Sequence, residues 1–242
     1  MAVVTGGSRG IGAATAAVLA RQGWSVAGGY LQNAGAARSV ADACADEDPK
    51  AVALPVDVAS EDSVVRFFAA VDEELGQLWA LINMIGVVGP PARVDEYDAG
   101  RVTHLLAVNA PGSILCARAA VRRMSPRHGG AVVDVSSAAA RPGSPGEYVD
   151  DAASKGAIDT FSLGLAREVA AEGIRVNAVR PGLIRTEIRA RGGQPDRLAR
   201  LAPFIPIDRV GEAPEVAHTS AWLCSEGASY VTGALIDVSG GR

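Results

Sequence analysis

The stretch that decides the fold lies close to the N-terminus and reads Ala2-Val3-Val4-Thr5-Gly6-Gly7-Ser8-Arg9-Gly10-Ile11-Gly12. A short apolar run leads into a glycine-rich loop, and residues 11–21 continue with helical spacing. In such a strand–loop–helix unit Gly6 permits a tight turn, Gly10 lets the backbone approach a phosphate, and Gly12 lets the helix pack closely. The helix N-terminus attracts negative charge. The stretch therefore predicts a dinucleotide-binding α/β fold.

Strand-like and helix-like patterns alternate along the rest of the chain. Helical spacing marks residues 60–75 and 152–171. Buried strands are indicated by short apolar runs at residues 2–4, 24–27, 51–54, 78–82, 131–135, 174–179 and 234–238. This alternation is typical of a parallel sheet covered on both faces. We expect one Rossmann-type, doubly wound α/β domain of about seven strands over residues 1–242.

Composition narrows the class of protein. The net charge is −4 and no block of basic residues occurs, which excludes nucleic acid as a main partner. The three cysteines and three histidines are scattered, so we predict neither a disulfide framework nor a metal site. No unbroken apolar run reaches the roughly 20 residues of a membrane span, and the N-terminus has no signal-peptide pattern. The sequence predicts a cytoplasmic protein with a small-molecule substrate and no membrane partner.

Motifs spread over the chain resemble the short-chain dehydrogenase/reductase family. The glycine loop is similar to the family's Thr-Gly-x-x-x-Gly-Ile-Gly, and further matches follow the third, fourth and sixth predicted strands. The resemblance implies that a nicotinamide dinucleotide is bound by Thr5, Gly6, Ser8, Arg9, Gly10, Ile11, Gly12, Tyr30, Asp57, Val58, Asn83, Gly86, Lys155, Pro181, Gly182, Ile184 and Thr186.

The second predicted strand indicates which dinucleotide is preferred. It ends in Gly28-Gly29-Tyr30-Leu31-Gln32-Asn33, with no acid to hold a ribose 2′-hydroxyl. Arg9 stands in the glycine loop, where a guanidinium can bind a 2′-phosphate, although it could also be an ordinary solvated loop charge. We therefore expect NADP(H) as the cofactor.

The catalytic set departs from the family at one position. Lys155 lies four residues after Asp151, in a segment that resembles the family's Tyr-x-x-x-Lys helix with aspartate in place of tyrosine. Asn109 resembles the helix asparagine of the family, and Ser137 resembles the serine that hydrogen-bonds a substrate carbonyl. The resemblance implies a catalytic set of Asp151, Lys155, Ser137 and Asn109.

An aspartate at position 151 changes the expected chemistry. The ordinary pKa of an aspartic acid is about 3.9, and an ammonium one helical turn away lowers the pKa of a carboxyl further. Asp151 is then expected to be an anion paired with Lys155, which is a poor proton donor to an alkoxide. An iminium substrate needs no such proton, because hydride addition leaves a neutral amine. The first hypothesis is an NADPH-dependent imine or iminium reductase in specialised metabolism.

Two other classes of function stay open. The scaffold could catalyse a redox-neutral cyclisation, isomerisation or dehydration with Asp150, Asp151 and Tyr148, although Tyr148 is expected to pack in the loop before the helix. The chain could also be a non-catalytic subunit. Natural divergence is favoured over an engineered aspartate, because residues 83–86 also depart from the family pattern. In that segment Met84 and Ile85 could crowd the cofactor or simply repack the core.

Two further expectations concern assembly and the edge of the site. Residues 184–208, rich in Arg, Gly and Pro, are predicted to form a substrate lid, with a plain surface loop as the alternative. The long helices resemble those through which family members form homodimers and homotetramers. An apolar stripe could serve this contact or face the sheet; it comprises Ala157, Ile158, Phe161, Leu165 and Val169.

Overall fold

The computed structural model describes residues 1–45, 50–124, 128–186 and 196–242. Its main sheet has seven parallel strands in the order β3-β2-β1-β4-β5-β6-β9. These strands are β1 (Ala2–Thr5), β2 (Val26–Tyr30), β3 (Ala51–Pro55), β4 (Ala80–Asn83), β5 (Gly130–Val135), β6 (Ile174–Pro181) and β9 (Leu235–Val238). The prediction of a doubly wound α/β sheet is confirmed.

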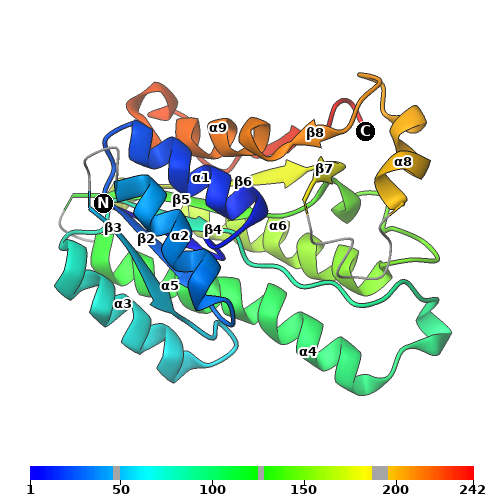
Figure 1. The fold of residues 1–242 in the computed structure, drawn as a ribbon, viewed down its shortest axis with the longest axis horizontal. Coiled ribbons are helices and arrows are strands. Elements are labelled where there is room, and N and C mark those ends of the chain that lie inside the picture. Colours follow the sequence, from blue (N-terminus) through cyan, green and yellow to red (C-terminus); the bar gives the residue numbers. More distant parts are fainter. Residues whose placement is uncertain (46–49, 125–127, 187–195) are drawn as a thin grey trace.

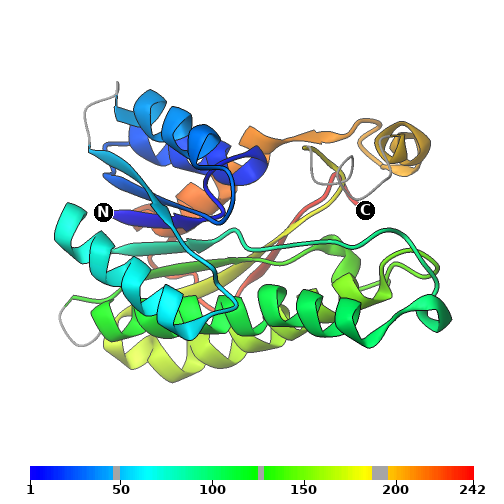
Figure 2. The same ribbon diagram turned by 60° about the horizontal axis from the view of Figure 1, so that its bottom comes forward.

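Helices cover both faces of this sheet (Figures 1 and 2). One face carries α1 (Gly10–Arg21), α2 (Ala34–Ala45) and α9 (Ala213–Cys224). The other carries α3 (Glu61–Leu75), α4 (Ala99–Asn109), α5 (Pro111–Met124) and α6 (Val149–Val169). Alternation along β1 separates the two layers: Val4 packs into the first core cluster and Val3 into the second.

The strand order places the site. The chain runs outward from β1 to β3 and then crosses back, so β4 pairs with the opposite side of β1. In an open α/β sheet the crevice outside the carboxyl ends of the strands at this switch point is where ligands bind. A short parallel pair, β7 (Ile184–Arg185) and β8 (Gly211–Glu212), and helix α8 (Arg197–Leu201) lie near this edge (Figure 1).

Several element boundaries differ from the sequence-based expectation. Helix α6 begins at Val149, three residues before the expected start, so Asp150 and Asp151 both lie in its first turn.

The apolar stripe of α6 mostly faces the sheet. Ile158 and Val169 are buried, and the partly buried Phe161 and Leu165 pack on the core cluster that contains Val169. Only Ala157 of the stripe is exposed.

One segment of the chain is more apolar than the search for unbroken apolar runs indicated. Ala99–Met124, which comprises α4 and α5, is long and apolar enough to cross a membrane by length and composition. More than half of its most apolar window, 56%, is buried inside the domain. A search for unbroken apolar runs misses it because polar residues such as His104 and Asn109 interrupt it. Its burial against α6 and the sheet is that of a core helix.

Candidate active site

A cleft of about 430 Å³ opens at the carboxyl ends of the strands. It extends from the glycine loop to the first turn of α6 and to α8. The predicted site residues that line it are Gly6, Ser8, Arg9, Gly10, Ile11, Gly12, Tyr30, Asp57, Val58, Gly86, Ser137, Asp151, Lys155, Pro181, Gly182, Ile184 and Thr186. Cavities of 300–1,000 Å³ commonly hold cofactors and small ligands.

The glycines of the loop allow it to pack tightly against neighbouring backbone. Gly6 has φ +68°, and a Cβ there would lie 2.6 Å from the Met84 carbonyl oxygen. A Cβ on Gly12 would collide with the Gly6 carbonyl. Arg9 is exposed at the N-cap of α1, and no acidic residue occupies the first turn of that helix. These features leave the N-terminal end of α1 open and positively charged, which suits a ligand that carries phosphate groups.

The end of β2 forms the neighbouring wall. Tyr30, Leu31, Gln32 and Asn33 all line the cleft, and none is acidic. Asp57, at the end of β3, is exposed and accepts a hydrogen bond from the Ala59 N–H at 3.0 Å. The carboxylates that line the cleft are those of Asp57 and Asp151, and the residues that follow β2 contribute none.

Asp151 lines the cleft from the first turn of α6 and is only 3% exposed. Its Oδ1 accepts a long hydrogen bond of 3.4 Å from Asn109 Nδ2. Its backbone N–H donates to Asp150 Oδ1 at 3.0 Å, and its carbonyl accepts from Ser154 Oγ at 2.7 Å. The carboxylate is thus held in a mostly dry wall that also contains Ile85 and Val135.

Lys155 lies one turn further along the same helix and is 6% exposed. Its Nζ donates to the carbonyl of Ile85 at 2.9 Å and to that of Val135 at 2.8 Å. These bonds fix the ammonium between the ends of β4 and β5. The ion pair expected between Lys155 and Asp151 stays a prediction.

The other two members of the predicted catalytic set differ in position. Ser137 lines the cleft, and its Oγ accepts a hydrogen bond from the Ala139 N–H at 3.1 Å. Asn109 is fully buried behind the wall. Its amide bonds both the N–H and the carbonyl of Val87 and donates to Ser154 Oγ at 3.0 Å. Asn109 therefore joins the loop after β4 to α6, next to Asp151.

Two predicted cofactor residues also lie behind the wall. Thr5 Oγ1 accepts from the Met84 N–H at 3.1 Å and is completely buried. Asn83 donates from Nδ2 to Asp134 Oδ1 at 2.8 Å and to the Ser113 carbonyl at 3.1 Å. Both residues support the loop that carries Ile85 and Gly86, and they do not border the cleft.

The departures at residues 84 and 85 are accommodated by the core. Ile85 is 6% exposed, packs in the core cluster beneath α5 and is one of the residues that line the cleft. Met84 packs against the opposite cluster. The cleft remains open beside both residues, which favours core repacking over closure of the site.

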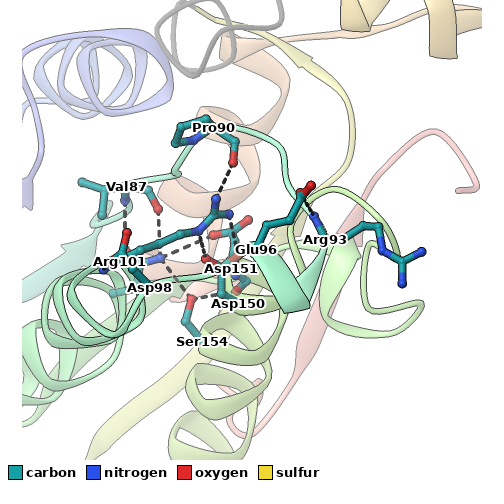
Figure 3. A network of polar contacts seen from close by, with 10 residues as sticks. Val87, Pro90, Arg93, Glu96, Asp98, Arg101, Asp150, Asp151 and Ser154 are labelled. Atoms are coloured by element: carbon teal, nitrogen blue, oxygen red, sulfur yellow. Dashed lines mark hydrogen bonds and ion pairs between the residues drawn. The ribbon is translucent and has the colours of Figure 1, made fainter.

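A polar network behind Asp151 joins three segments (Figure 3). Arg101 of α4 donates from Nε to Asp150 Oδ2 at 2.7 Å and from Nη2 to Asp150 Oδ1 at 3.3 Å. Its Nη1 donates to the Pro90 carbonyl at 2.7 Å, and its guanidinium lies 4.0 Å from the centre of the Tyr97 ring. Burial opposes ionisation of Asp150, but the hydrogen bonds from Arg101 and the Asp151 N–H outweigh it and lower the pKa of this carboxyl.

The far end of the cleft includes two residues of the predicted lid segment 184–208 and one residue of α4. Arg197 and Leu198 of α8 and His104 of α4 line it. Tyr148, the N-cap of α6, is 1% exposed and lies under the Arg197 guanidinium, 5.5 Å from its carbon to the ring centre. It packs in the loop before the helix, as expected. The predicted lid spans 184–208, of which residues 187–195 lie outside the described part of the chain.

Comparison with known proteins identifies the family. A family model described as enoyl-(acyl carrier protein) reductase matches residues 6–242. A curated oxidoreductase of Escherichia coli (strain K12), YgfF, which is called uncharacterized, is 50% identical over 245 residues, covering 100% of this chain and 99% of that protein. The chain belongs to the short-chain dehydrogenase/reductase family.

Other members of the family agree in fold and reaction type. A cis-4-hydroxycyclohexanecarboxylate dehydrogenase of Sinomonas cyclohexanicum is 38% identical over 241 residues. The alignment covers 100% of this chain and 95% of the dehydrogenase. The crystal structure of levodione reductase superposes with a TM-score of 0.92 at 26% identity, covering 99% of this chain and 96% of that one. This short-chain dehydrogenase/reductase is therefore an oxidoreductase by type, in a family that uses NAD(H) or NADP(H).

Proposed function

We propose that this protein is an NADPH-dependent reductase of iminium carbons, in which Asp151 occupies the position of the family's catalytic tyrosine. The observation that carries the proposal is the Asp151 carboxylate, 3% exposed and lining the cleft one helical turn from Lys155. A carboxylate in such a place stabilises a cation. An iminium ion is the cation that accepts a hydride.

The choice of cofactor is supported by charge. Arg9 lies beside the cleft at the start of α1, and the residues after β2 that line the cleft carry no acid. A 2′-phosphate is attracted by this arrangement, whereas a bare ribose finds no carboxylate there to bind its hydroxyls. When bound, NADPH supplies the hydride.

The proton requirement separates iminium from carbonyl substrates. A carbonyl becomes an alkoxide when hydride arrives and needs an acid beside it. An ordinary aspartic acid, with a pKa of about 3.9, is ionised at neutral pH and a nearby ammonium favours that ionised form. The Sinomonas cyclohexanicum dehydrogenase is named for an alcohol and levodione reductase for a carbonyl compound, so Asp151 is expected to shift the substrate class within a shared hydride-transfer framework.

The remaining polar groups have supporting roles in this proposal. Lys155, held by two carbonyls, lines the cleft and would orient the nicotinamide ribose. Ser137 also lines the cleft and offers a hydroxyl for a polar group of the substrate. Asn109 acts through Asp151, because its amide contacts Oδ1 and limits rotation of the carboxylate.

The redox-neutral alternative finds less support. Asp150 is engaged by Arg101, and Tyr148 is buried beneath Arg197, so neither is placed to move a substrate proton. Burial raises the pKa of both the Cys116 and the Cys224 thiol to about 12, which disfavours thiolate chemistry. A purely non-catalytic role is disfavoured by the open cleft beside Ile85.

We also propose that the protein acts in the cytoplasm as a homodimer or homotetramer. All three cysteines are buried, and Cys116 and Cys224 are free thiols, which suits a reducing compartment. Leu106 of α4 is 38% exposed and Ile114 of α5 is 40% exposed. These side chains lie on the helices whose family counterparts form subunit contacts.

The test compares two substrates on the wild-type protein. A cyclic N-methyl iminium salt and a cyclic ketone of the same ring size are each incubated with the protein and NADPH. The molecular masses of the products are then measured by mass spectrometry. The proposal predicts reduction of the iminium salt and little turnover of the ketone. Faster reduction of the ketone, or an isomer of either substrate as the product, contradicts it.

A further inference from the structure

A second charged group lines the cleft at the end remote from the glycine loop. Arg197 of α8 is 6% exposed, and the cleft that it borders also contains Asp151 and Ser137. The guanidinium lies against Tyr148, which is three residues before Asp151 at the start of α6. With a rise of about 1.5 Å per residue, this places Arg197 within the reach of a small substrate held at Asp151.

In the described part of the chain, the hydrogen bonds of the Arg197 guanidinium come from Nε and Nη2, on one of its edges. Nε donates to Glu147 Oε2 at 3.2 Å and Nη2 donates to the same oxygen at 3.1 Å. Within residues 1–45, 50–124, 128–186 and 196–242, no hydrogen bond engages Nη1. A guanidinium carries five N–H donors, so Arg197 keeps donors for an acceptor in the cleft.

Among the described residues around Arg197, positively charged groups outnumber negatively charged ones. The other oxygen of Glu147, Oε1, accepts from Arg200 Nη2 at 2.6 Å, so two guanidinium groups share one carboxylate. Arg242 adds a third cation nearby: burial, followed by repulsion from Arg197, lowers the pKa of its guanidinium. Burial opposes ionisation of Glu147, but the hydrogen bonds from Arg200 and Arg197 outweigh it and lower the pKa of that carboxyl.

We infer that Arg197 forms an anion subsite of the cleft and binds a carboxylate carried by the substrate. The inference rests on the proposed function only for the other end of the substrate, where the cationic carbon meets Asp151. The substrate class is then a zwitterion, with its reacting cation at Asp151 and its carboxylate at Arg197. Guanidinium groups are well suited to carboxylates because their donors match the two oxygens.

A cofactor phosphate is the other anion that could reach a cationic group in the cleft. Arg197 lies beside Tyr148 and Glu147 at the start of α6, whereas the phosphate-binding loop lies at the start of α1. The position at the reacting end of α6 favours the substrate carboxylate. The test separates the two sources by measuring both ligands on the same variants.

The experiment is a calorimetric titration of benzoate into the full-length protein, alone and saturated with NADPH, with benzamide as the neutral control. We expect benzoate to bind and benzamide to bind much more weakly. Arg197→Gln should weaken benzoate binding about tenfold and leave NADPH binding unchanged. Arg200→Gln is the matched control on the same helix, and it should change benzoate binding less than about twofold.

A second variant, which is expected to strengthen benzoate binding, distinguishes the loss of a binding group from damage to the structure. Glu147→Gln removes the carboxylate that competes for Arg197, so benzoate should bind about threefold or more tightly. Weaker binding by both Arg197→Gln and Glu147→Gln indicates only damage to α8 and overturns the inference. Loss of NADPH affinity in Arg197→Gln with unchanged benzoate binding assigns the residue to the cofactor and also overturns it.

The readout is independent of hydride transfer. If the protein fails to reduce iminium salts but binds benzoate through Arg197, the proposed function falls and the subsite stands. If iminium salts are reduced and benzoate does not bind, the subsite falls alone.

Discussion

Arg101 grips the Asp150 carboxylate through two hydrogen bonds, from Nε at 2.7 Å and from Nη2 at 3.3 Å, and Asp150 in turn accepts the backbone N–H of Asp151. The pair is largely buried, with side-chain exposures of 13% and 4%. It ties α4 and the loop that contains Pro90 to the first turn of α6 (Figure 3). The orientation of Asp151 therefore depends on an ion pair that does not itself line the cleft.

Removal of this clamp should destabilise the fold. Arg101→Met leaves the Asp150 carboxylate buried without its main partner, and we expect a loss of about 3 kcal/mol in the free energy of unfolding. Urea titration measures it. Arg93→Met is the control, because the Arg93–Asp95 pair is exposed and should contribute less than about 1 kcal/mol. Equal losses in the two variants would refute a structural role for the clamp.

Stability should fall in acid partly through Asp150. Its carboxyl has a lower pKa in the folded protein than the value of about 3.9 in an unfolded chain. The ion pair is therefore fully stabilising above about pH 3.9, and its contribution is lost as the pH falls through the folded-state pKa. Urea titrations at neutral pH and near pH 3 should show a smaller pH-dependent loss in Asp150→Asn than in the wild type. An identical loss in both proteins would argue against this linkage.

Arg9 should select the cofactor. Arg9→Ala removes the guanidinium beside the glycine loop, so we expect NADPH binding to weaken roughly tenfold or more while NADH binding stays the same. Calorimetric titration with both cofactors measures this. Arg21→Ala, at the other end of α1, is the control and should leave both affinities unchanged. Equal weakening for NADPH and NADH in Arg9→Ala would mean that Arg9 does not bind a 2′-phosphate.

Ile85 should matter for stability and little for the cofactor. Its side chain is buried in the core cluster beneath α5, so Ile85→Ala should lower the free energy of unfolding by about 3 kcal/mol. The NADPH affinity should change less than about twofold, because the side chain packs in the core. A marked gain in NADPH affinity would instead mean that the branched side chain crowds the cofactor.

The sequence predicted the layers of the fold because they follow from local patterns. Short apolar runs marked β1 and β5, and the glycine loop marked the junction of β1 with α1. The parallel order of the strands then brought most of the predicted cofactor residues to one cleft. A residue that directly follows a strand of a parallel sheet can be placed at the carboxyl edge of that sheet from the sequence alone.

Local sequence patterns could not predict the contacts between segments that are far apart in the chain. Arg101 and Asp150 are 49 residues apart, and Arg197 and Glu147 are 50 apart, so no periodicity relates the partners. The same limit applies to Thr5 and Asn83, whose motif positions suggested cofactor contact. Their short polar side chains turn away from the cleft and hydrogen-bond neighbouring strands and loops.

Substitution of Asp151 tests whether its carboxylate selects a cationic substrate, as we propose. Initial rates of NADPH oxidation are measured with the iminium salt and the matched ketone for wild type, Asp151→Asn and Asp151→Tyr. We predict that Asp151→Asn loses at least about tenfold in kcat/KM for the iminium salt, and that Asp151→Tyr gains ketone reduction. Full retention of iminium turnover by Asp151→Asn, with NADPH still bound, would contradict the account.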